Sequence, residues 1–307
     1  MSNYVVGVDV GGTNVKLGLV NSKGQVIVRT SFATTSFSSC PTALINAIAA
    51  HIKTLILEAK VPYQHIIGIG VGLPGLIDPV KGVVRFLPNI PGWHNVRLGA
   101  LLKTKTGLPV YIDNDVKMIT LAEARFGAGR GVKNMVCLTL GTGVGAGLIL
   151  DGRLYRGQAN AAGELGHMPL NEHGPLCTCG GSACYERYVG NKALFALAVK
   201  ISGIKGATTE LMYARAKQGD KKALLFWRKA ATHIGNGLVG IVNLLNPTLI
   251  VIGGGVSNNQ EFLFPTIRDV LKKRCMSLQG GMVRIKRAQF KDNAGLIGAY
   301  VLVNDAR

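Results

Sequence analysis

The sequence of 307 residues lacks any apolar run that approaches the length of a membrane-spanning helix, about 18–20 residues. A signal-peptide pattern is also missing, because the first apolar run, Tyr4–Val10, carries Asp9 inside it. No low-complexity linker interrupts the chain. These absences predict a soluble, cytoplasmic protein that has no membrane partner.

Acidic and aromatic residues are scarce. Asp and Glu number 16 against 35 Lys and Arg, which leaves a formal charge of +19, and aromatic residues make up 6% of the chain. A strongly basic protein can bind nucleic acid or other polyanions. Here the basic residues are spread along the chain, and no cluster of them is interleaved with aromatic residues. We therefore interpret the charge as a solvated positive surface and predict no nucleic-acid partner.

Cysteine is scarce outside one short segment. Cys40, Cys137 and Cys275 are scattered and are interpreted as ordinary buried side chains, whereas three others are bunched within eight residues. Bunching favours metal ligation in a reducing compartment over a disulfide framework. With a nearby histidine, three thiolates complete a tetrahedral set for structural zinc. The sequence therefore predicts a closed zinc site formed by His167, Cys177, Cys179 and Cys184.

Strand and helix patterns alternate along the chain, which is typical of an α/β fold. Apolar or alternating runs predict strands at 4–10, 16–20, 25–30, 66–71, 109–112, 134–140, 144–150, 248–252 and 283–290. Helical periodicity predicts helices at 41–60, 96–106, 116–126, 186–200, 207–217, 220–245, 259–275 and 293–304.

The pattern of the first hairpin returns at an offset of 130 residues. Gly11 aligns with Gly141, and Leu19-Val20 aligns with Ile149-Leu150. Two hairpins with glycine turns at matching places predict a duplicated α/β unit. We expect two lobes of about equal weight with a cleft between them.

Three glycine turns follow predicted strands. Glycines let a backbone approach a ligand closely, and successive N–H groups can then converge on phosphate oxygens. Asp9 would be costly to bury unless it meets a cation. One such turn is equally typical of an ordinary hairpin, but three favour a nucleoside triphosphate, although the P-loop pattern is absent. The residues predicted to hold it are Asp9, Gly11, Gly12, Thr13, Asn14, Lys16, Gly141, Thr142, Gly143, Gly253, Gly254 and Gly255.

Asp113-Asn114-Asp115 follows one predicted strand and opens a predicted helix. Helix capping explains part of this composition, since Asp and Asn are favoured at helix starts. Two acids around an amide are more than a cap needs. Phosphoryl transfer requires an acceptor for the hydroxyl proton, which a carboxylate supplies, and the amide of Asn114 would fix neighbouring hydroxyls. The residues alone leave both the capping and the catalytic interpretation open.

Together these motifs resemble the ROK family of sugar kinases, which belongs to the sugar kinase, hexokinase and actin superfold. The most specific part is Gly163-Glu164-Leu165-Gly166-His167, followed by the cysteine cluster and Glu186. The resemblance covers essentially the whole chain. It implies an α/β fold of two ribonuclease-H-like lobes, each a βββαβα unit, with an interlobe active-site cleft. It also implies an ATP:hexose 6-phosphotransferase that uses ATP with Mg²⁺ and carries a structural Zn²⁺.

The resemblance also assigns roles to individual residues. Asp115 is the implied catalytic base, and His167 is implied to bind zinc through one nitrogen and the sugar through the other. The residues implied to contact the sugar are Asn89, Asn114, Asp115, Glu164, His167 and Glu186. The chain departs from the family pattern at Val116-Lys117, where Ala-Asn is common, and at Ala183 and Tyr185, where Gly and Leu are usual.

The resemblance further predicts the domain limits and the substrate. We expect a small lobe at 1–115 plus 293–307, with the first phosphate loop and Asp115, and a large lobe at 116–292, with the second phosphate loop, the zinc loop and the adenosine loop. Glucose is the favoured acceptor, followed by N-acetylmannosamine or N-acetylglucosamine, and then fructose or allose. Some family members use inorganic polyphosphate as donor, which the scattered charge does not favour here.

Two further expectations concern partners. Repressors of this family resemble the kinases with a helix-turn-helix domain added in front, and we expect none here because the first strand pattern begins at Tyr4. The kinases are commonly dimers through the larger lobe. Since residues 223–245 are apolar on more than one helical face, we predict a homodimer.

Overall fold

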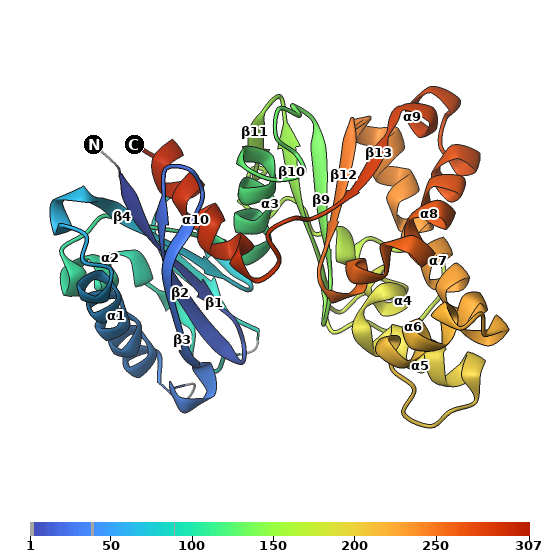
Figure 1. Cartoon of the computed structure of the whole chain (residues 1–307), viewed down its shortest axis with the longest axis horizontal. Helices are drawn as coiled ribbons and strands as arrows, with labels where there is room; N and C mark the ends of the chain where they lie inside the picture. Colours follow the sequence, from blue (N-terminus) through green and yellow to red (C-terminus); the bar gives the residue numbers. More distant parts are fainter. Residues whose placement is uncertain (1–2, 38–39, 89) are drawn as a thin grey trace. The chain divides into compact units, whose positions relative to one another are not determined.

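The computed structural model of the chain describes residues 3–37, 40–88 and 90–307. Contacts divide the chain into two compact units (Figure 1). Unit 1 consists of Met1–Gly131, Leu154–Ala162 and Gln289–Arg307, and unit 2 consists of Val132–Arg153 and Gly163–Ala288. Among the described residues, no helix is long and apolar enough to cross a membrane.

The sheet of unit 1 has the strand order β3-β2-β1-β4-β8, in which β4 and β8 run parallel to β1 and the hairpin partner β2 runs antiparallel to it. The strands are Tyr4–Val10 (β1), Asn14–Asn21 (β2), Val26–Ala33 (β3), Ile66–Leu73 (β4) and Val110–Asn114 (β8). The helices are Pro41–Glu58 (α1), Leu98–Thr106 (α2), Asp115–Arg125 (α3) and Ala294–Asp305 (α10), and a small second sheet is formed by Leu76–Asp78 (β5), Val83–Phe86 (β6) and His94–Val96 (β7).

Helix α10 packs on the centre of this sheet. It is apolar nearly all round, and every residue from Ala294 to Val303 is buried. Strands β1 and β4 face it with glycines: a Cβ on Gly7 would lie 2.7 Å from the backbone oxygen of Leu296, and a Cβ on Gly70 would lie 2.7 Å from that of Ala299. These glycines let the helix approach the sheet closely.

The sheet of unit 2 repeats this order as β11-β10-β9-β12-β13. Its strands are Met135–Leu140 (β9), Val144–Leu150 (β10), Arg153–Tyr155 (β11), Leu249–Gly253 (β12) and Arg284–Arg287 (β13). Its helices are Glu186–Val189 (α4), Asn191–Ser202 (α5), Thr209–Lys217 (α6), Lys221–Leu245 (α7), Gln260–Arg274 (α8) and Ser277–Met282 (α9). The shared strand order confirms the predicted duplication of an α/β unit.

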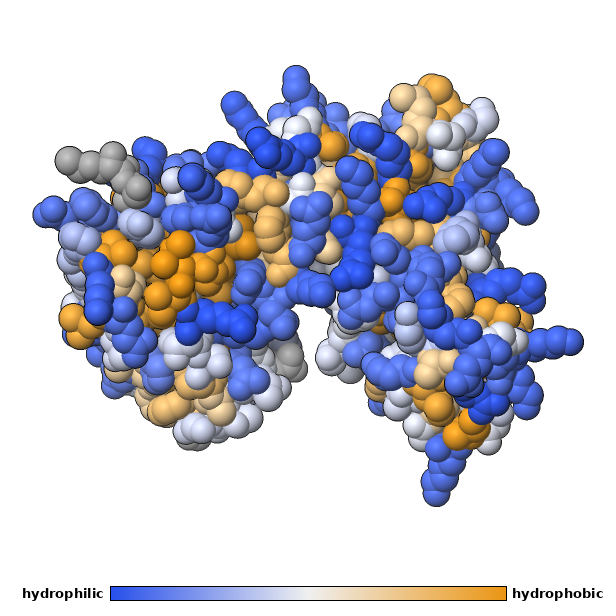
Figure 2. Space-filling model, viewed as in Figure 1, coloured by the Kyte–Doolittle hydropathy of each residue, from blue (hydrophilic) through white to orange (hydrophobic). Residues whose placement is uncertain are grey.

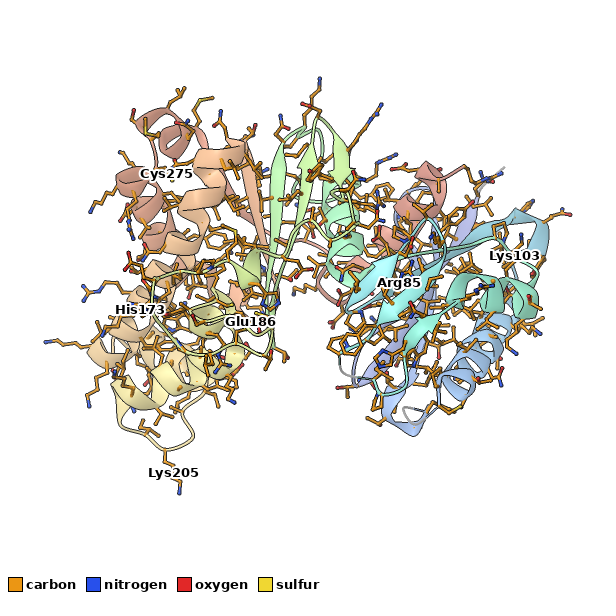
Figure 3. All side chains as sticks on the ribbon, turned by 180° about the vertical axis from the view of Figure 1, so that it is seen from behind. Arg85, Lys103, His173, Glu186, Lys205 and Cys275 are labelled. Atoms are coloured by element: carbon orange, nitrogen blue, oxygen red, sulfur yellow. The ribbon has the colours of Figure 1, made fainter. Side chains whose placement is uncertain are left out.

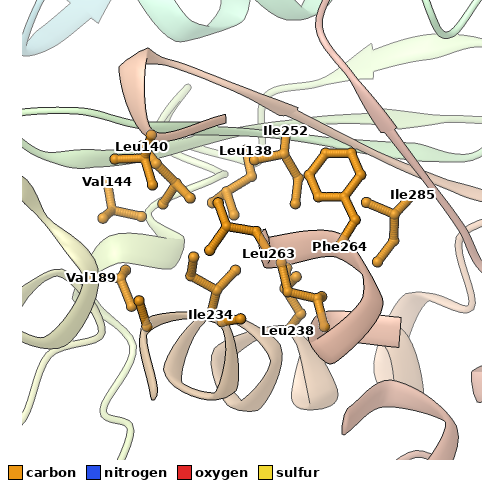
Figure 4. Packing of buried hydrophobic residues seen from close by; sticks show 14 of the residues in the cluster. Leu138, Leu140, Val144, Val189, Ile234, Leu238, Ile252, Leu263, Phe264 and Ile285 are labelled. Carbon is orange, nitrogen blue, oxygen red and sulfur yellow. The ribbon is translucent and has the colours of Figure 1, made fainter. Parts of the chain in front are cut away.

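The core of unit 2 lies between the sheet and the long helix α7. Leu138 and Ile252 of the sheet belong to the same buried cluster as Ile234 and Leu238 of α7 and Leu263 of α8 (Figure 4). The buried residues of α7 occupy one face, so part of the apolar surface that the sequence places on more than one face lies outside this core. The leucines that break the pattern are solvent-exposed, at 39% for Leu224 and 78% for Leu244.

The alignment of the two hairpins needs one correction. In the first hairpin Val6 pairs with Leu19, and in the second Val136 pairs with Leu148, not with Ile149. The offset of 130 therefore holds for the outgoing strands only. The returning strands are offset by 129, because Val10 pairs with Val15 across the first turn, whereas Leu140 pairs with Val144 across a turn one residue shorter.

The units also differ from the predicted limits. Helix α3 and the segment 154–162 belong to unit 1 rather than to the large lobe. The physical reason for α3 is that it packs on α10, which in turn packs on β1. Smaller differences are the β5–β7 sheet in a region expected to be loop, and the predicted helix 186–200, which is interrupted at Gly190.

Candidate active site and metal centre

The Asn114–Asp115 turn joins β8 to α3. Asn114 caps the helix, since its Oδ1 accepts from the backbone N–H of Val116 at 3.0 Å, while its Nδ2 donates to the carbonyl of Gly75 at 3.3 Å. Asp115 is the first residue of the helix, and its Oδ1 accepts from the same N–H of Val116 at 2.8 Å. The turn therefore holds both polar side chains in fixed positions at the carboxyl end of a parallel strand. Open α/β sheets bind ligands at this end.

An ion pair beside this turn was not predicted from the sequence. Arg156 donates from both Nε and Nη2 to Oδ2 of Asp113, which is 1% exposed. The two residues are 43 positions apart, so no local pattern connects them. In the sequence, Asp113 is distinguished only as the first acid of the Asp-Asn-Asp motif.

The first glycine turn follows Asp9 on β1. The N–H of Gly11 donates to the carbonyl of Asn14 at 2.9 Å, and the hydroxyl of Thr34 donates to the carbonyl of Gly11 at 2.8 Å. Gly12, Thr13 and Asn14 are exposed. Hydrogen bonds at Gly11 thus fix the turn, while its other residues are exposed to solvent. A phosphate-binding turn requires both properties.

Asp9 lies against the start of α10, where a Cβ on Gly295 would be 2.8 Å from the Asp9 Cγ. Burial, and then the negative charge of Asp115, raise the pKa of Asp9 from 3.8 to about 6, although the charge of Lys16 opposes this. Asp9 and Asp115 are therefore close enough to repel each other. Two repelling carboxylates on one face of a unit are a typical environment for a divalent cation.

The second glycine turn lies against Glu186. Oε2 of Glu186, which is labelled in Figure 3, accepts from the N–H of Val144 at 2.8 Å. A Cβ on Gly143 would lie 2.7 Å from that oxygen, so glycine is required for this contact. The carbonyl of Gly141 accepts from the N–H of Asn191 at the start of α5. The turn and the predicted sugar ligand Glu186 are thus brought together within unit 2.

The third glycine turn follows β12. Gly254 has a left-handed backbone, with φ of +83°, and a Cβ there would lie 2.0 Å from the carbonyl oxygen of Leu140. That carbonyl belongs to the end of β9, the strand that leads into the second glycine turn. Close packing at Gly254 therefore places the second and third turns side by side at one end of the sheet.

The predicted zinc ligands form a compact cluster. The ligand atoms of His167, Cys177, Cys179 and Cys184 all lie within 4.8 Å of one another. Sγ of Cys177 is 3.8 Å from Nδ1 of His167, and Sγ of Cys179 is 3.6 Å from Sγ of Cys184. Tetrahedral zinc with sulfur at about 2.3 Å requires ligand separations of about 3.8 Å. The cluster fits zinc.

The protonation of the thiols also suits a cation. Burial, and then the neighbouring Cys179 and Cys177, raise the pKa of Cys184 to about 12, while hydrogen bonds from the backbone of Gly181 and from the adjacent thiols lower the pKa of Cys179. Thiols arranged in this way share protons that a metal ion would displace.

His167 has a second polar neighbour. Its Nε2 is 4.0 Å from Oε2 of Glu164, whereas its Nδ1 faces the thiols. The side chains of both Glu164 and His167 are exposed. This arrangement agrees with a histidine that binds a metal through one nitrogen and a ligand through the other.

The remaining predicted site residues are Lys16 and Asn89. Nζ of Lys16 donates to the exposed Asp292 at 3.2 Å. Asn89 lies outside the described residues. The predicted site residues thus form two groups, one in unit 1 around Asp9, Asn114 and Asp115, and one in unit 2 around Glu164, His167 and Glu186.

Sequence and structure comparisons relate the chain to a known family. The sequence pattern of the ROK family matches residues 5–306. The chain is 32% identical to the glucokinase of Thermotoga maritima over 98% of this chain and 97% of the relative, and 30% identical to the xylose repressor of Caldicellulosiruptor bescii over 97% of this chain but 77% of the relative. A ROK family glucokinase from Streptomyces griseus, solved with glucose and AMPPNP, superposes with a TM-score of 0.82 at 30% identity, over 99% of this chain and 100% of that one.

Proposed function

The chain belongs to the ROK family, and from this premise we propose that it is an ATP-dependent hexose kinase that phosphorylates the 6-hydroxyl of glucose. The glucokinase relatives cover nearly the whole chain, which supports the kinase and favours glucose. N-acetylmannosamine and N-acetylglucosamine are the next candidates, and fructose or allose follow. The choice among these sugars depends on the shape of the binding-pocket wall that would face the sugar 2-substituent.

The observation that carries the proposal is the position of Asp115. Its carboxylate is fixed at the start of α3, beside Asp9 and next to Asn114. In the proposed reaction Asp115 accepts the proton of the sugar 6-hydroxyl while that oxygen bonds to the γ-phosphorus of ATP. The bond to the β,γ-bridging oxygen breaks, and ADP leaves with its electron pair.

The donor and its metal ion would be held by the glycine turns and Asp9. Exposed backbone at Gly12 and Thr13, and the Gly141–Gly143 and Gly253–Gly255 turns, suit phosphate oxygens and the adenosine. Burial and the negative charge of Asp115 raise the pKa of Asp9 more than the nearby Lys16 lowers it. A Mg²⁺ ion beside this carboxylate would stabilise its ionised form. Bound Mg²⁺ would neutralise the phosphate charge that develops during transfer. ATP is the proposed donor because the basic residues are scattered along the sequence, a distribution that does not favour polyphosphate.

The residues proposed to contact the sugar hydroxyls are Glu164, His167 and Glu186, which belong to unit 2, and Asn114 and Asn89, which belong to unit 1. Zinc would be held by the His167 and cysteine cluster and would keep the loop that carries these ligands in shape. This role is structural, so the chemistry of transfer does not pass through zinc.

The proposal also includes a homodimer. Four exposed side chains at the adjoining ends of α7 and α9 form what we call the α9 patch, namely Leu244, Met276, Leu278 and Met282. Each is more than 60% exposed, and the N–H of Met276 donates to Asn243 of α7. Hydrophobic residues gather at α9 in Figure 2. Apolar surface of this kind favours a protein partner.

A panel of hexoses in an assay coupled to ADP release tests the kinase proposal. We expect glucose to be phosphorylated, and Asp115→Asn to lower kcat by at least about 100-fold while ATP binding is retained, because the positioned base is lost. Asp220→Asn is a matched control: Asp220 also accepts N–H groups at a helix start, in α7. It should keep kcat. Turnover near the wild-type rate in Asp115→Asn would remove Asp115 from the role of base, and polyphosphate in place of ATP should give no product.

The xylose repressor relative supports one alternative, a sugar-responsive transcriptional regulator. In this alternative function the chain would bind DNA in a sugar-dependent way and release no ADP. A gel-shift assay run beside the kinase assay separates the two functions, and we expect ADP release without specific DNA binding.

A further inference from the structure

Arg156 forms an ion pair with the buried Asp113, and both carboxylate oxygens of Asp113 are hydrogen-bonded. Nε and Nη2 of Arg156 donate to Oδ2 of Asp113 at 3.0 and 2.7 Å. Oδ1 of Asp113 accepts from the backbone N–H of Asn114 at 2.8 Å. The guanidinium is therefore connected, through one carboxylate, to the backbone of the turn that carries Asp115.

The segment that contains Arg156 contacts the chain on both sides of this turn. Arg156 binds Asp113, which precedes the turn, and the carbonyl of Asn160 accepts from Nζ of Lys117, which follows it. The side chain of Lys117 is buried, at 5% exposure. Two charged side chains, one on each side of Asn114–Asp115, thus hold a single segment.

The segment 154–162 connects parts of the chain that belong to different units. Residues 154–162 belong to unit 1, although Arg153 before them and Gly163 after them belong to unit 2. Glu164, a candidate sugar ligand, follows Gly163 directly. The segment that is attached beside the proposed base therefore continues into the loop that carries proposed sugar ligands.

We propose that Arg156 is a positioning residue for proton transfer, acting through Asp113 on the Asn114–Asp115 turn. Without Arg156 the buried Asp113 carboxylate has lost its cationic partner, so it moves toward water. This movement withdraws the fixed acceptor of the Asn114 N–H. A displacement of about 1 Å in a reacting group lowers a rate by about 100-fold, so the carboxylate of Asp115 is sensitive to a loosened turn. This inference rests on the proposed kinase function.

The first test compares Arg156→Ala with Arg215→Ala. Arg215 donates from Nε and Nη2 to one oxygen of Asp220, as Arg156 does to Asp113, but it lies on α6 of unit 2 and its partner caps α7. We expect Arg156→Ala to lower kcat by about 10- to 100-fold with the KM for ATP changed less than about two-fold, because positioning and not ATP binding is lost. Arg215→Ala should affect thermal stability only.

Chemical rescue provides a readout that a purely structural role would not move. Millimolar guanidinium should restore part of the kcat of Arg156→Ala and none of that of Asp115→Asn. Arg156→Lys, which keeps one donor and the charge, should retain more activity than Arg156→Ala. A folded Arg156→Ala protein with wild-type kcat overturns the proposal, as does the same loss of kcat in Arg215→Ala.

A double variant covers the case in which Arg156→Ala does not fold. Asp113→Asn with Arg156→Ala removes the uncompensated buried charge and should fold. Its kcat should be no higher than about one tenth of the wild-type value, because the segment no longer holds the turn. Wild-type kcat in the double variant would refute the role of Arg156. Absence of kinase activity in the wild-type protein would instead refute the proposed function.

Discussion

At the scale of single residues, Asp9 combines burial with a function that requires charge. Its pKa is raised to about 6 by burial and by Asp115, whereas an unfolded Asp titrates near 3.8. The native state therefore binds more protons than the unfolded state between these values, and stability falls as pH rises through this window. Above pH 6 the ionised carboxylate costs up to about 3 kcal/mol, which a bound cation would offset.

Asp9→Asn should therefore stabilise the metal-free protein at pH 7.5 while it abolishes kinase activity. The stability gain should shrink as pH falls through about 6, because the wild-type carboxyl then takes up its proton. Thermal unfolding in chelator between pH 5 and 8 measures this, with Asp269→Asn, at an exposed position on α8 of unit 2, as control. A gain that does not change with pH would contradict the assigned titration.

Gly254 is the second residue with a sharp requirement. A side chain there combines a left-handed backbone with a contact of 2.0 Å to the Leu140 carbonyl. Gly254→Ala should cost at least about 2 kcal/mol of stability, through strain and displacement of the β9 end. The neighbouring Gly255 has open space around its Cβ position. Gly255→Ala should stay within about 0.5 kcal/mol in denaturant unfolding, and equal losses in both variants would refute the packing argument.

At the scale of elements, the loop between β11 and α4 depends on its cysteines. It contains little regular structure beyond a 3-10 turn at Leu165–His167. Loops of this length need an internal constraint, which the four clustered ligands provide. The loop also carries Glu164 and leads into Glu186, so the proposed sugar binding by these residues would depend on its shape.

Cys179→Ser should therefore lose zinc and raise the KM for glucose together. Elemental analysis of the purified wild-type protein should find one zinc per chain. Cys40→Ser should retain it, because Cys40 lies outside the cluster and is exposed, not buried as the sequence predicted. A zinc-free wild-type protein with full activity would show that the cluster has another role.

At the scale of the whole molecule, charge and apolar surface act in opposite directions. A net charge of +19 keeps copies apart, while the α9 patch favours association. At physiological salt, repulsion between exposed charges more than about 8 Å apart is largely screened. Short-range apolar contact therefore prevails over repulsion between the spread charges. The proposed dimer should therefore tighten with salt.

Sedimentation at micromolar concentration tests the dimer. We expect a wild-type dimer, dissociation by Leu278→Glu, and no effect of Leu57→Glu, on α1 of unit 1, which is equally apolar and 78% exposed. Only monomer in the wild-type protein, or dissociation by both substitutions, would show that the α9 patch is not the interface.

Local pattern was sufficient for much of this protein. The strands that lead into the glycine turns, the helix that begins at Asp115 and the clustered cysteines were predictable, because each depends on residues near one another in sequence. The strand order of both units agrees with the predicted duplication. Asn114 illustrates the limit of prediction from local pattern. An asparagine at this position predicted both a helix cap and a ligand-binding residue, and only the structure shows that its Oδ1 accepts from the N–H of Val116.

Sequence by itself thus determined the α/β fold class and indicated the cluster of candidate metal ligands, since periodicity and spacing encode them, whereas Asp115 was singled out as candidate base by the resemblance to the ROK family. Tertiary structure decided where α3 belongs, which leucines of α7 reach solvent, and that Arg156 lies against Asp113. Those outcomes depend on packing between residues far apart in the chain. A pairing across 43 positions leaves no periodic trace, because the geometry that joins its members exists only once the sheet and the segment 154–162 have folded together.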